Sequence, residues 1–223
     1  MNQPSAFSLA MKRPRVLLAD DHRLVAEGLK SLLSAEFELV GVVEDGRALL
    51  EAARRLRPDV IVADITMPHL NGIDALVQLK QEDKRVRVVL LTMHTEVAYA
   101  RRALEAGAAG YVLKHSAPAE LIAAIRAALD GNTYVTPALA GEVFQSMKRE
   151  PNKAVDPVAS LTPRQREILQ LLAEGRSAKE IGVALAVSAR TVEFHKYQMM
   201  EKLDLHTNAE LVHFALKHGV ATI

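Results

Sequence analysis

Residues 60–72 read VIVADITMPHLNG, a β-branched apolar run that ends on Asp64 and is followed by a short polar loop. Three other apolar runs end in the same way on a polar side chain. Besides Asp64, the residues at these ends are Asp20, Asp21, Thr92 and Lys114. If the runs are neighbouring parallel strands, all five side chains lie at the carboxyl edge of one sheet, where open α/β sheets bind ligands. Three acids, one hydroxyl and one ammonium predict a site for a hard divalent cation and a phosphoryl group.

Residues 14–130 alternate between short β-branched runs and amphipathic stretches of helical period. The strands expected are Arg15–Asp20, Glu38–Val43, Val60–Asp64, Val86–Thr92 and Gly110–Leu113. The helices expected are Leu24–Ser34, Arg47–Leu56, Ile73–Gln81, Val97–Ala106 and Ala119–Leu129. Strand–helix repeats joined by short connections predict an α/β fold with a doubly wound, five-stranded parallel sheet.

The rest of the chain divides into a leader, a linker and a second domain. Residues 1–13 are expected to be a disordered leader. Residues 131–160, which contain three prolines and a polar stretch, are expected to be a linker with a helix over Ala138–Met147. Residues 161–223 show no strand signal but three capping boxes, which begin at Thr162, Ser177 and Thr207. This pattern predicts an all-α domain of four helices with a helix–turn–helix.

Composition narrows the class of protein. The chain has 223 residues, 49% of them hydrophobic, so two domains with real cores are possible. The absence of cysteine excludes disulfides and thiolate metal sites. No apolar run approaches the roughly 20 residues of a membrane span, which favours a cytoplasmic protein. From Val158 onward, 8 basic residues face 7 acidic ones, so overall charge alone would not hold this segment on DNA.

The carboxylates at the sheet edge suggest specific roles. Clustered acids protonate or recruit a cation, and Mg²⁺ prefers oxygen ligands. Asp64 is the best candidate nucleophile for a phosphoryl group, because it ends a central strand. Asp21 would bind the metal with support from Asp20, and the backbone carbonyl of Thr66 would complete the protein ligands. Thr92 and Lys114 would hold phosphate oxygens. For each Asp alone, a helix cap or turn is the alternative.

The ordered motifs resemble a known family. LADDH (18–22), DITMPHLNG (64–72), LLT (90–92) and GYVLK (110–114) resemble the receiver domain of two-component response regulators, a flavodoxin-like fold. Residues 161–218 resemble the LuxR-type helix–turn–helix, so the whole is similar to the NarL/FixJ subfamily. The resemblance implies phosphorylation of Asp64 by a histidine kinase, Mg²⁺ at Asp21, and a switch through Thr92 and Tyr111. The sequence departs from the family pattern at two positions, His69 and His115.

The resemblance also implies that the helix over Ala189–Leu203 reads DNA. It further implies that the protein binds double-stranded DNA as a homodimer. The positions that match base-contacting residues are Glu193, Phe194 and Tyr197. The positions that match residues near the phosphate backbone are Ser188, Arg190, Thr191, His195, Lys196 and Lys202. Family members often have lysine at the position of Glu193. The Glu193 carboxylate either accepts a hydrogen bond from cytosine N4 or is a solvated acid on the helix surface. Phe194 either contacts a thymine methyl group or packs within the domain.

Some alternatives stay open. His22, His69, His94 and His115 each follow a strand end on the same edge. They are either unrelated loop histidines or residues that make phosphorylation pH-sensitive or bind a transition metal. A second function is a phosphorylation-independent DNA-binding regulator whose receiver fold only dimerises. Phosphatase activity is not expected, because Thr66 stands where such enzymes need a second acid. The chain is therefore expected not to be an enzyme.

Overall fold

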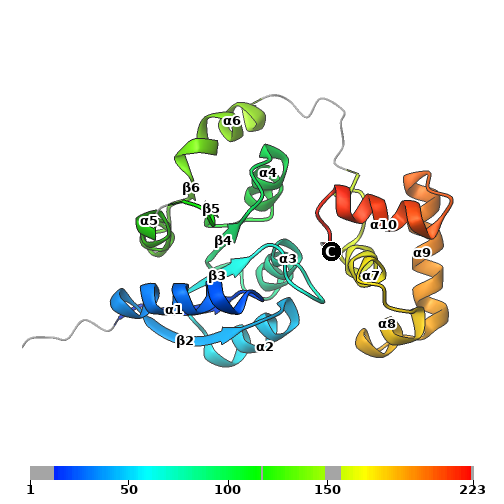
Figure 1. Cartoon of the computed structure of the whole chain (residues 1–223), viewed down its shortest axis with the longest axis horizontal. Coiled ribbons are helices and arrows are strands. Elements are labelled where there is room, and N and C mark those ends of the chain that lie inside the picture. The colour runs from blue at the N-terminus through cyan, green and yellow to red at the C-terminus, as the bar shows by residue number, and fades with distance from the viewer. Residues whose placement is uncertain (1–12, 117, 149–156, 222–223) are drawn as a thin grey trace, which may run out of the picture.

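The structure, a computed structural model, describes residues 13–116, 118–148 and 157–221 (Figure 1). All of the expected leader except Arg13 lies outside these residues. The N-terminal domain contains a parallel sheet with the strand order β2-β1-β3-β4-β5-β6. The strands are β1 (Arg15–Ala19), β2 (Glu38–Val43), β3 (Val60–Asp64), β4 (Val88–Thr92), β5 (Gly110–Leu113) and β6 (Tyr134–Val135). The predicted doubly wound five-stranded sheet is confirmed, and β6 extends it at one edge.

Helices cover both faces of the sheet. They are α1 (Arg23–Glu36), α2 (Gly46–Leu56), α3 (Gly72–Glu82), α4 (Val97–Glu105) and α5 (Pro118–Leu129). Successive strand residues point to opposite faces, so Val16 and Val62 join the core under α1 and α5. Leu17 and Ile61 join the core under α2, α3 and α4. The strand order reverses between β1 and β3, which places the topological switch point between the ends of these two strands.

The segment expected as a linker begins with ordered structure. It contains β6 and then α6 (Pro137–Lys148), whose Leu139 and Val143 are buried in the core shared with α4. The helix agrees with the helical stretch expected from the sequence. The short strand was not expected, because two residues are too few to show a period.

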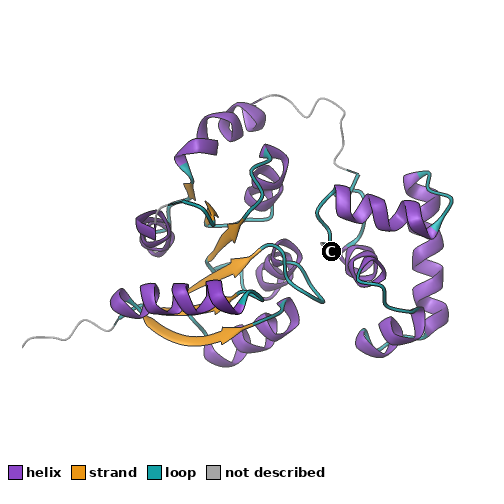
Figure 2. Ribbon diagram, viewed as in Figure 1, coloured by secondary structure: helices purple, strands orange, loops and turns teal. Residues whose placement is uncertain are grey.

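The C-terminal domain is built from helices alone within residues 157–221 (Figure 2). They are α7 (Pro163–Ala173), α8 (Ala178–Ala184), α9 (Ala189–Leu203) and α10 (Asn208–Lys217). All three predicted capping boxes are present, and Ser188 caps α9 through the backbone N–H of Thr191. The domain core contains Ile168, Val192, Met199 and Leu211. This confirms the predicted four-helix domain.

Among the described residues, every helix is too short or too polar to cross a membrane.

Candidate functional site

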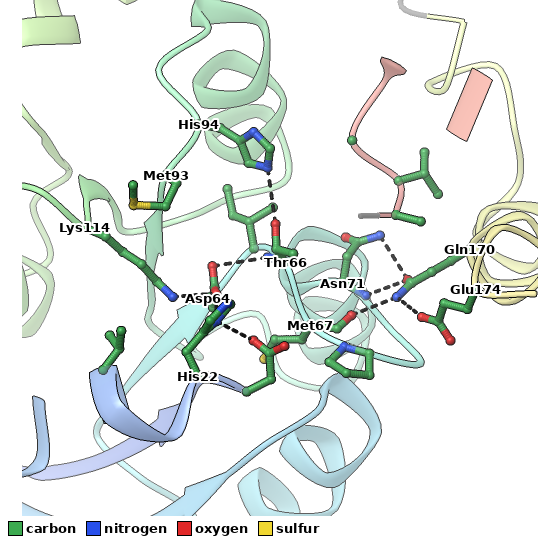
Figure 3. A pocket seen from close by; sticks show the side chains of 17 residues that line it. His22, Asp64, Thr66, Met67, Asn71, Met93, His94, Lys114, Gln170 and Glu174 are labelled. Atoms are coloured by element: carbon green, nitrogen blue, oxygen red, sulfur yellow. Dashed lines mark hydrogen bonds and ion pairs between the residues drawn. The ribbon is translucent and has the colours of Figure 1, made fainter. Parts of the chain in front are cut away.

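The predicted acidic residues converge at the switch point of the sheet. Figure 3 shows one of them, Asp64, with His22 and Lys114 beside it. Asp20 and Asp21 follow β1, and Asp64 ends β3, the strand beside β1. One ligand atom from each of these three residues, together with one from His22, lies within 4.8 Å of the others. Asp20 is 1% exposed and Asp64 is 3% exposed. Such closely spaced carboxylates repel one another unless a cation neutralises them.

Lys114 supplies a positive charge to this cluster. Its Nζ atom lies 2.6 Å from Oδ2 of Asp64 and 2.8 Å from Oδ2 of Asp20. Burial alone would lower the pKa of Lys114, but the charges and hydrogen bonds of Asp64 and Asp20 raise it above its usual value. Burial also raises the pKa of Asp64, against the opposing effect of Lys114. The ammonium therefore stays charged and holds the two carboxylates in place.

The loop after β3 fixes the position of Asp64. The backbone N–H of Thr66 donates to Oδ1 of Asp64 at 3.2 Å, and the N–H of Gly72 donates to the carbonyl of Ile65 at 2.8 Å. A Cβ atom at position 72 would lie 2.1 Å from the carbonyl oxygen of Asp64. Only glycine allows the start of α3 to approach the end of β3 this closely. Thr66 is thus held beside Asp64, and the role of its carbonyl as a metal ligand stays a prediction.

Thr92 and Tyr111 are linked to each other through one backbone segment. Thr92 is fully buried at the end of β4, and its Oγ1 accepts a hydrogen bond from the N–H of His94 at 3.0 Å. Tyr111 is fully buried on β5, and its hydroxyl donates to the carbonyl of His94 at 2.9 Å. Burial raises the pKa of Tyr111, which keeps this hydroxyl a donor. Both side chains thus bond to the backbone of His94, and their role in a switch stays a prediction.

A cavity of about 600 Å³ lies over the carboxylates and is lined by both domains. The C-terminal domain contributes Gln170, Glu174 and residues 219–221 to its wall. Figure 3 shows Gln170 and Glu174 beside the loop that carries Met67 and Asn71. The cavity is large enough for a small phosphorylated molecule, and Asp64 at the end of β3 is part of its lining.

Helix α7 docks on the loop after β3 through hydrogen bonds that sequence reasoning missed. The side chain of Gln170 accepts from the N–H of Asn71 at 2.8 Å and donates to the carbonyl of Met67 at 2.8 Å. Oε1 of Glu174 accepts from the N–H of His69 at 2.9 Å. Gln170 is 2% exposed. The only signal in the sequence was a set of polar residues on α7 that ordinary helical patterning places on a solvated face.

Two ion pairs reinforce this docking. Arg166 on α7 pairs with Asp74 on α3, and Glu167 pairs with Arg47 on α2. Asp74 is 5% exposed and Glu167 is 6% exposed, so both carboxylates are largely removed from water. A buried ion pair adds little net stability compared with apolar contact, but the loss of one partner is costly. The pairs therefore specify how the domains fit together.

The predicted DNA-reading residues lie on α9, on the side of the C-terminal domain away from the sheet (Figure 1). Phe194 is 57% exposed and Tyr197 is 63% exposed. Lys196, by contrast, is 9% exposed and forms an ion pair with Glu193. Lys202 Nζ donates to the carbonyl of Ser160. The structure thus leaves two aromatic side chains available to a partner and engages two of the expected cations within the domain.

The remaining predicted positions on α9 are split in the same way. Ser188 and Thr191 bond to each other at the helix start, with their hydroxyl oxygens 2.8 Å apart. Arg190 is exposed, and His195 is partly buried beside the ring of Phe194. Roles for these residues in DNA binding stay predictions.

The four histidines at the sheet edge do not form one cluster. His22 faces the carboxylates, with Nδ1 2.9 Å from Oδ1 of Asp21. His94 bonds through Nε2 to the hydroxyl of Thr66 at 3.2 Å and stacks on Tyr99. His69 has Nδ1 3.8 Å from Asp45, and His115 lies in the exposed turn after β5. Any shared role for all four is therefore not supported by their placement.

Two family models match the chain, one on each domain. The model described as response regulator receiver domain matches residues 16–126. The model described as bacterial regulatory proteins, luxR family, matches residues 159–215. The carboxylate cluster lies within the first match, and α8 and α9 lie within the second.

Individual proteins are similar over nearly the whole length. The response regulator UvrY of Escherichia coli (strain K12) is 34% identical over 207 residues, which cover 92% of this chain and 94% of UvrY. A structure of RcsB from Salmonella enterica serovar Typhimurium, bound to a promoter in the presence of phosphomimetic BeF3−, has a TM-score of 0.61 and 27% identity and covers 91% of this chain and 98% of that one. A structure of two RcsB dimers bound to two parallel DNAs has a TM-score of 0.56 and 27% identity, with coverage of 91% and 98%.

Proposed function

Because the chain belongs to the two-component response regulators with a LuxR-type DNA-binding domain, we propose that a histidine kinase phosphorylates it on Asp64 and that this modification controls its binding to DNA. The observation that carries the proposal is the convergence of Asp20, Asp21, Asp64 and Lys114 on one buried position. The family acts in transcription regulation rather than as enzymes. We propose that the protein acts in the cytoplasm, where it is phosphorylated by the kinase and binds DNA.

The chemistry follows from the position of Asp64. One carboxylate oxygen of Asp64 attacks the phosphorus of the donor, the bond from phosphorus to the donor's imidazole nitrogen breaks, and the imidazole leaves with the bonding electron pair. Lys114 then exchanges its contact with Asp64 for a phosphoryl oxygen, because the new group carries about −1.5 to −2 charges. Thr92 supplies a hydroxyl on the neighbouring strand that can donate to the same group.

The residues present suit Mg²⁺. Asp20, Asp21 and Asp64 offer hard carboxylate oxygens, and Thr66 follows them with a backbone carbonyl. Bound Mg²⁺ would neutralise the developing charge on the transferring phosphoryl group. Two buried carboxylates that share a single ammonium in this structure are consistent with a site that takes further positive charge.

The docked α7 offers a route from the phosphoryl group to the second domain. Gln170 bonds to Met67 and Asn71 in the same loop that holds Thr66 beside Asp64. A new dianion at Asp64 reorganises this loop, so it changes the hydrogen bonds on which the docking of α7 depends. We propose that release of α7 also frees α10, whose pairing with a second copy would form a homodimer on DNA. The RcsB dimers on DNA support this step.

The decisive experiment compares the wild-type chain with Asp64→Ala after treatment with acetyl phosphate and Mg²⁺. DNA fragments selected from a genomic library with the phosphorylated protein serve as ligands, and mass in solution is measured in parallel. We expect wild-type DNA affinity to rise about tenfold or more on phosphorylation, and Asp64→Ala to show no change. Asp130→Ala, which removes an exposed carboxylate after α5, is the matched control and should behave as wild type.

Equal DNA affinity and equal mass for wild type and Asp64→Ala would overturn phosphorylation control. That outcome would favour a regulator that binds DNA without phosphorylation and uses the receiver fold only to dimerise.

A further inference from the structure

The cavity over the phosphorylation site has one wall from each domain. The N-terminal domain contributes Asp64 and Lys114, and the C-terminal domain contributes Gln170, Glu174 and the turn after α10, residues 219–221. Figure 3 shows Asp64 and Lys114 on one side of this space and Gln170 and Glu174 on the other. The reacting carboxylate therefore faces the second domain across the cavity.

The turn after α10 is held against α4. Nη1 of Arg102 on α4 donates to the carbonyl of His218 at 3.3 Å. A Cβ atom at position 219 would lie 1.8 Å from the hydroxyl oxygen of Tyr99, so the turn packs directly against that side chain. Val220 is 1% exposed and belongs to the core of the C-terminal domain. The turn is thus fixed by its own domain on one side and by α4 on the other.

The rest of the C-terminal wall is fixed by α7. Gln170 bonds to the backbone of Met67 and Asn71 in the loop after β3, and Arg166 pairs with Asp74 at the start of α3. The C-terminal domain is therefore bonded to the loop after β3 and also to α4. These contacts hold its wall in place across the cavity from the carboxylates.

The size of the cavity decides which donors reach Asp64. Its volume of about 600 Å³ corresponds to a cube with an edge of about 8 Å, whereas an α-helix with its side chains is about 10–12 Å across. A small phosphorylated molecule fits into this space, but a helix that carries a phosphohistidine does not. A protein donor therefore needs the C-terminal wall to move away.

We propose that the docked C-terminal domain makes Asp64 selective for small phosphodonors, and that transfer from a phosphohistidine on a protein requires the two domains to separate. This rests on the proposed function, since it concerns the donor for the same phosphorylation site. A kinase then reacts with the separated molecules, and the docked molecules stay open to small donors.

The fraction of separated molecules sets the rate with a large donor. A reaction that uses one of two conformations is slowed in proportion to the population of that conformation. A small donor reacts with both conformations, so its rate does not depend on docking. The ratio of the two rates therefore measures how far the docked domain closes the site.

Two donors with the same leaving group test the proposal. N-phosphorylimidazole is the small donor, and a helical peptide with one N-phosphorylated histidine is the large donor. With either donor, a carboxylate oxygen of Asp64 bonds to phosphorus, the bond from phosphorus to the ring nitrogen breaks, and that nitrogen keeps the electron pair. A solvent proton on the second ring nitrogen makes the leaving imidazole neutral. Mass spectrometry of the full-length chain, incubated with each donor and Mg²⁺, gives the two rates.

Arg102→Ala/Arg166→Ala is the variant that separates the domains. It removes the bond from α4 to the turn and leaves Asp74 without its ion-pair partner. An unpaired buried charge is strongly destabilising, so separation that admits water to Asp74 is favoured. We expect the ratio of the peptide rate to the phosphorylimidazole rate to be about tenfold or more higher in this variant than in wild type. X-ray scattering should show a larger radius of gyration.

Arg101→Ala/Arg190→Ala is the matched control for the loss of charge. It removes two positive charges from α4 and α9, where Arg101 bonds within its own helix and Arg190 is exposed. The ratio of the two rates and the radius of gyration should both match wild type.

A second variant changes the turn alone. In Gly219→Ala the new Cβ atom would overlap Tyr99, so the turn must leave α4. Gly131→Ala is its control, because Gly131 also has a positive φ, of 80° against 57°, and a Cβ atom there would meet no described atom within 4 Å. Both substitutions strain the backbone, but the ratio of the two rates should rise in Gly219→Ala and stay at the wild-type value in Gly131→Ala.

The outcomes separate this inference from the proposed function. If Arg102→Ala/Arg166→Ala has the same ratio of rates as wild type, the inference fails and phosphorylation at Asp64 stands. If Arg101→Ala/Arg190→Ala raises the ratio equally, charge and not docking controls the large donor, and the inference fails again. If neither donor phosphorylates any of these chains, the proposed function fails as well.

Discussion

The carboxylate cluster and helix α9 are the two functional regions of this chain, and they are built in opposite ways. Asp20 and Asp64 are buried, and Lys114 pairs with both of them before any ligand arrives. On α9, by contrast, side chains such as Phe194 and Arg190 are exposed to solvent. Phosphoryl transfer needs fixed geometry at the reacting atoms, whereas DNA recognition uses groups whose partners lie on another molecule. The structure of the chain alone therefore shows the contacts of the phosphorylation site, whereas the contacts of a DNA-binding helix are made only with the DNA.

The largest expected effect on stability and phosphorylation comes from a substitution at Gly72, where the backbone of α3 packs against the end of β3. Gly72→Ala would put a Cβ atom 2.1 Å from the carbonyl oxygen of Asp64, so α3 must move away from β3. We expect a loss of up to about 3 kcal/mol in the free energy of unfolding, together with a large loss of phosphorylation by acetyl phosphate. Urea denaturation and labelling with radioactive donor measure the two effects. DNA binding by α9 in the folded fraction should change little.

Gly28→Ala is the matched control for this substitution. Gly28 lies inside α1 on the exposed side, and a Cβ atom there would meet no described atom within 4 Å. Replacement of glycine by alanine in a helix should stabilise the protein by about 0.5–1 kcal/mol. If both variants destabilise the chain equally, the cluster does not depend on the close approach of α3.

A second prediction tests whether the two regions communicate through α7. Gln170→Ala leaves the N–H of Asn71 and the carbonyl of Met67 without their buried partner. Each unsatisfied group costs about 1–3 kcal/mol unless the domains separate and water reaches them. We expect separation, seen as a larger radius of gyration in X-ray scattering and faster hydrogen exchange in residues 67–71.

The exposed Gln145 on α6 provides the control for this effect. Gln145→Ala removes the same side chain without touching the docked surface, so both measurements should match wild type. An unchanged radius of gyration in Gln170→Ala would mean that the ion pairs of Arg166 and Glu167 hold the domains without the glutamine.

The smallest effect on stability is expected on α9. Phe194→Ala should change the free energy of unfolding by less than about 0.5 kcal/mol, because the side chain is exposed. It should weaken binding to selected DNA by about 1–3 kcal/mol if the ring contacts a thymine methyl. Val192→Ala, two residues earlier and fully buried, should instead cost about 1.6 kcal/mol of stability for two lost methyl groups. Thermal melts and fluorescence anisotropy with labelled DNA measure the two quantities.

Similar losses of stability in Phe194→Ala and Val192→Ala would contradict the difference drawn between the two regions. If Phe194→Ala lowers the melting temperature as much as Val192→Ala, the aromatic ring packs within the domain and is not reserved for a partner.

Much of the fold follows from the sequence, because β1, β3, β4 and β5 are buried almost throughout and their sequences are nearly continuous apolar runs. The ends of those runs also located Asp64 and Lys114, since all parallel strands finish at one edge. Patterning could not reveal β6, which is two residues long, or the docking of α7. Gln170 is buried only because a loop over 90 residues earlier supplies its hydrogen-bond partners, and such long-range pairing leaves no local period.

The short strand β6 has a consequence for how the molecule behaves in a crowded solution. It pairs with β5, so the strand that carries Tyr111 does not present a free row of amide and carbonyl groups to other chains. With two residues, β6 itself is too short a template for a further strand to add. The β5 edge of the sheet is thereby protected against edge-to-edge pairing by residues near the start of the segment that the sequence predicts to be a linker.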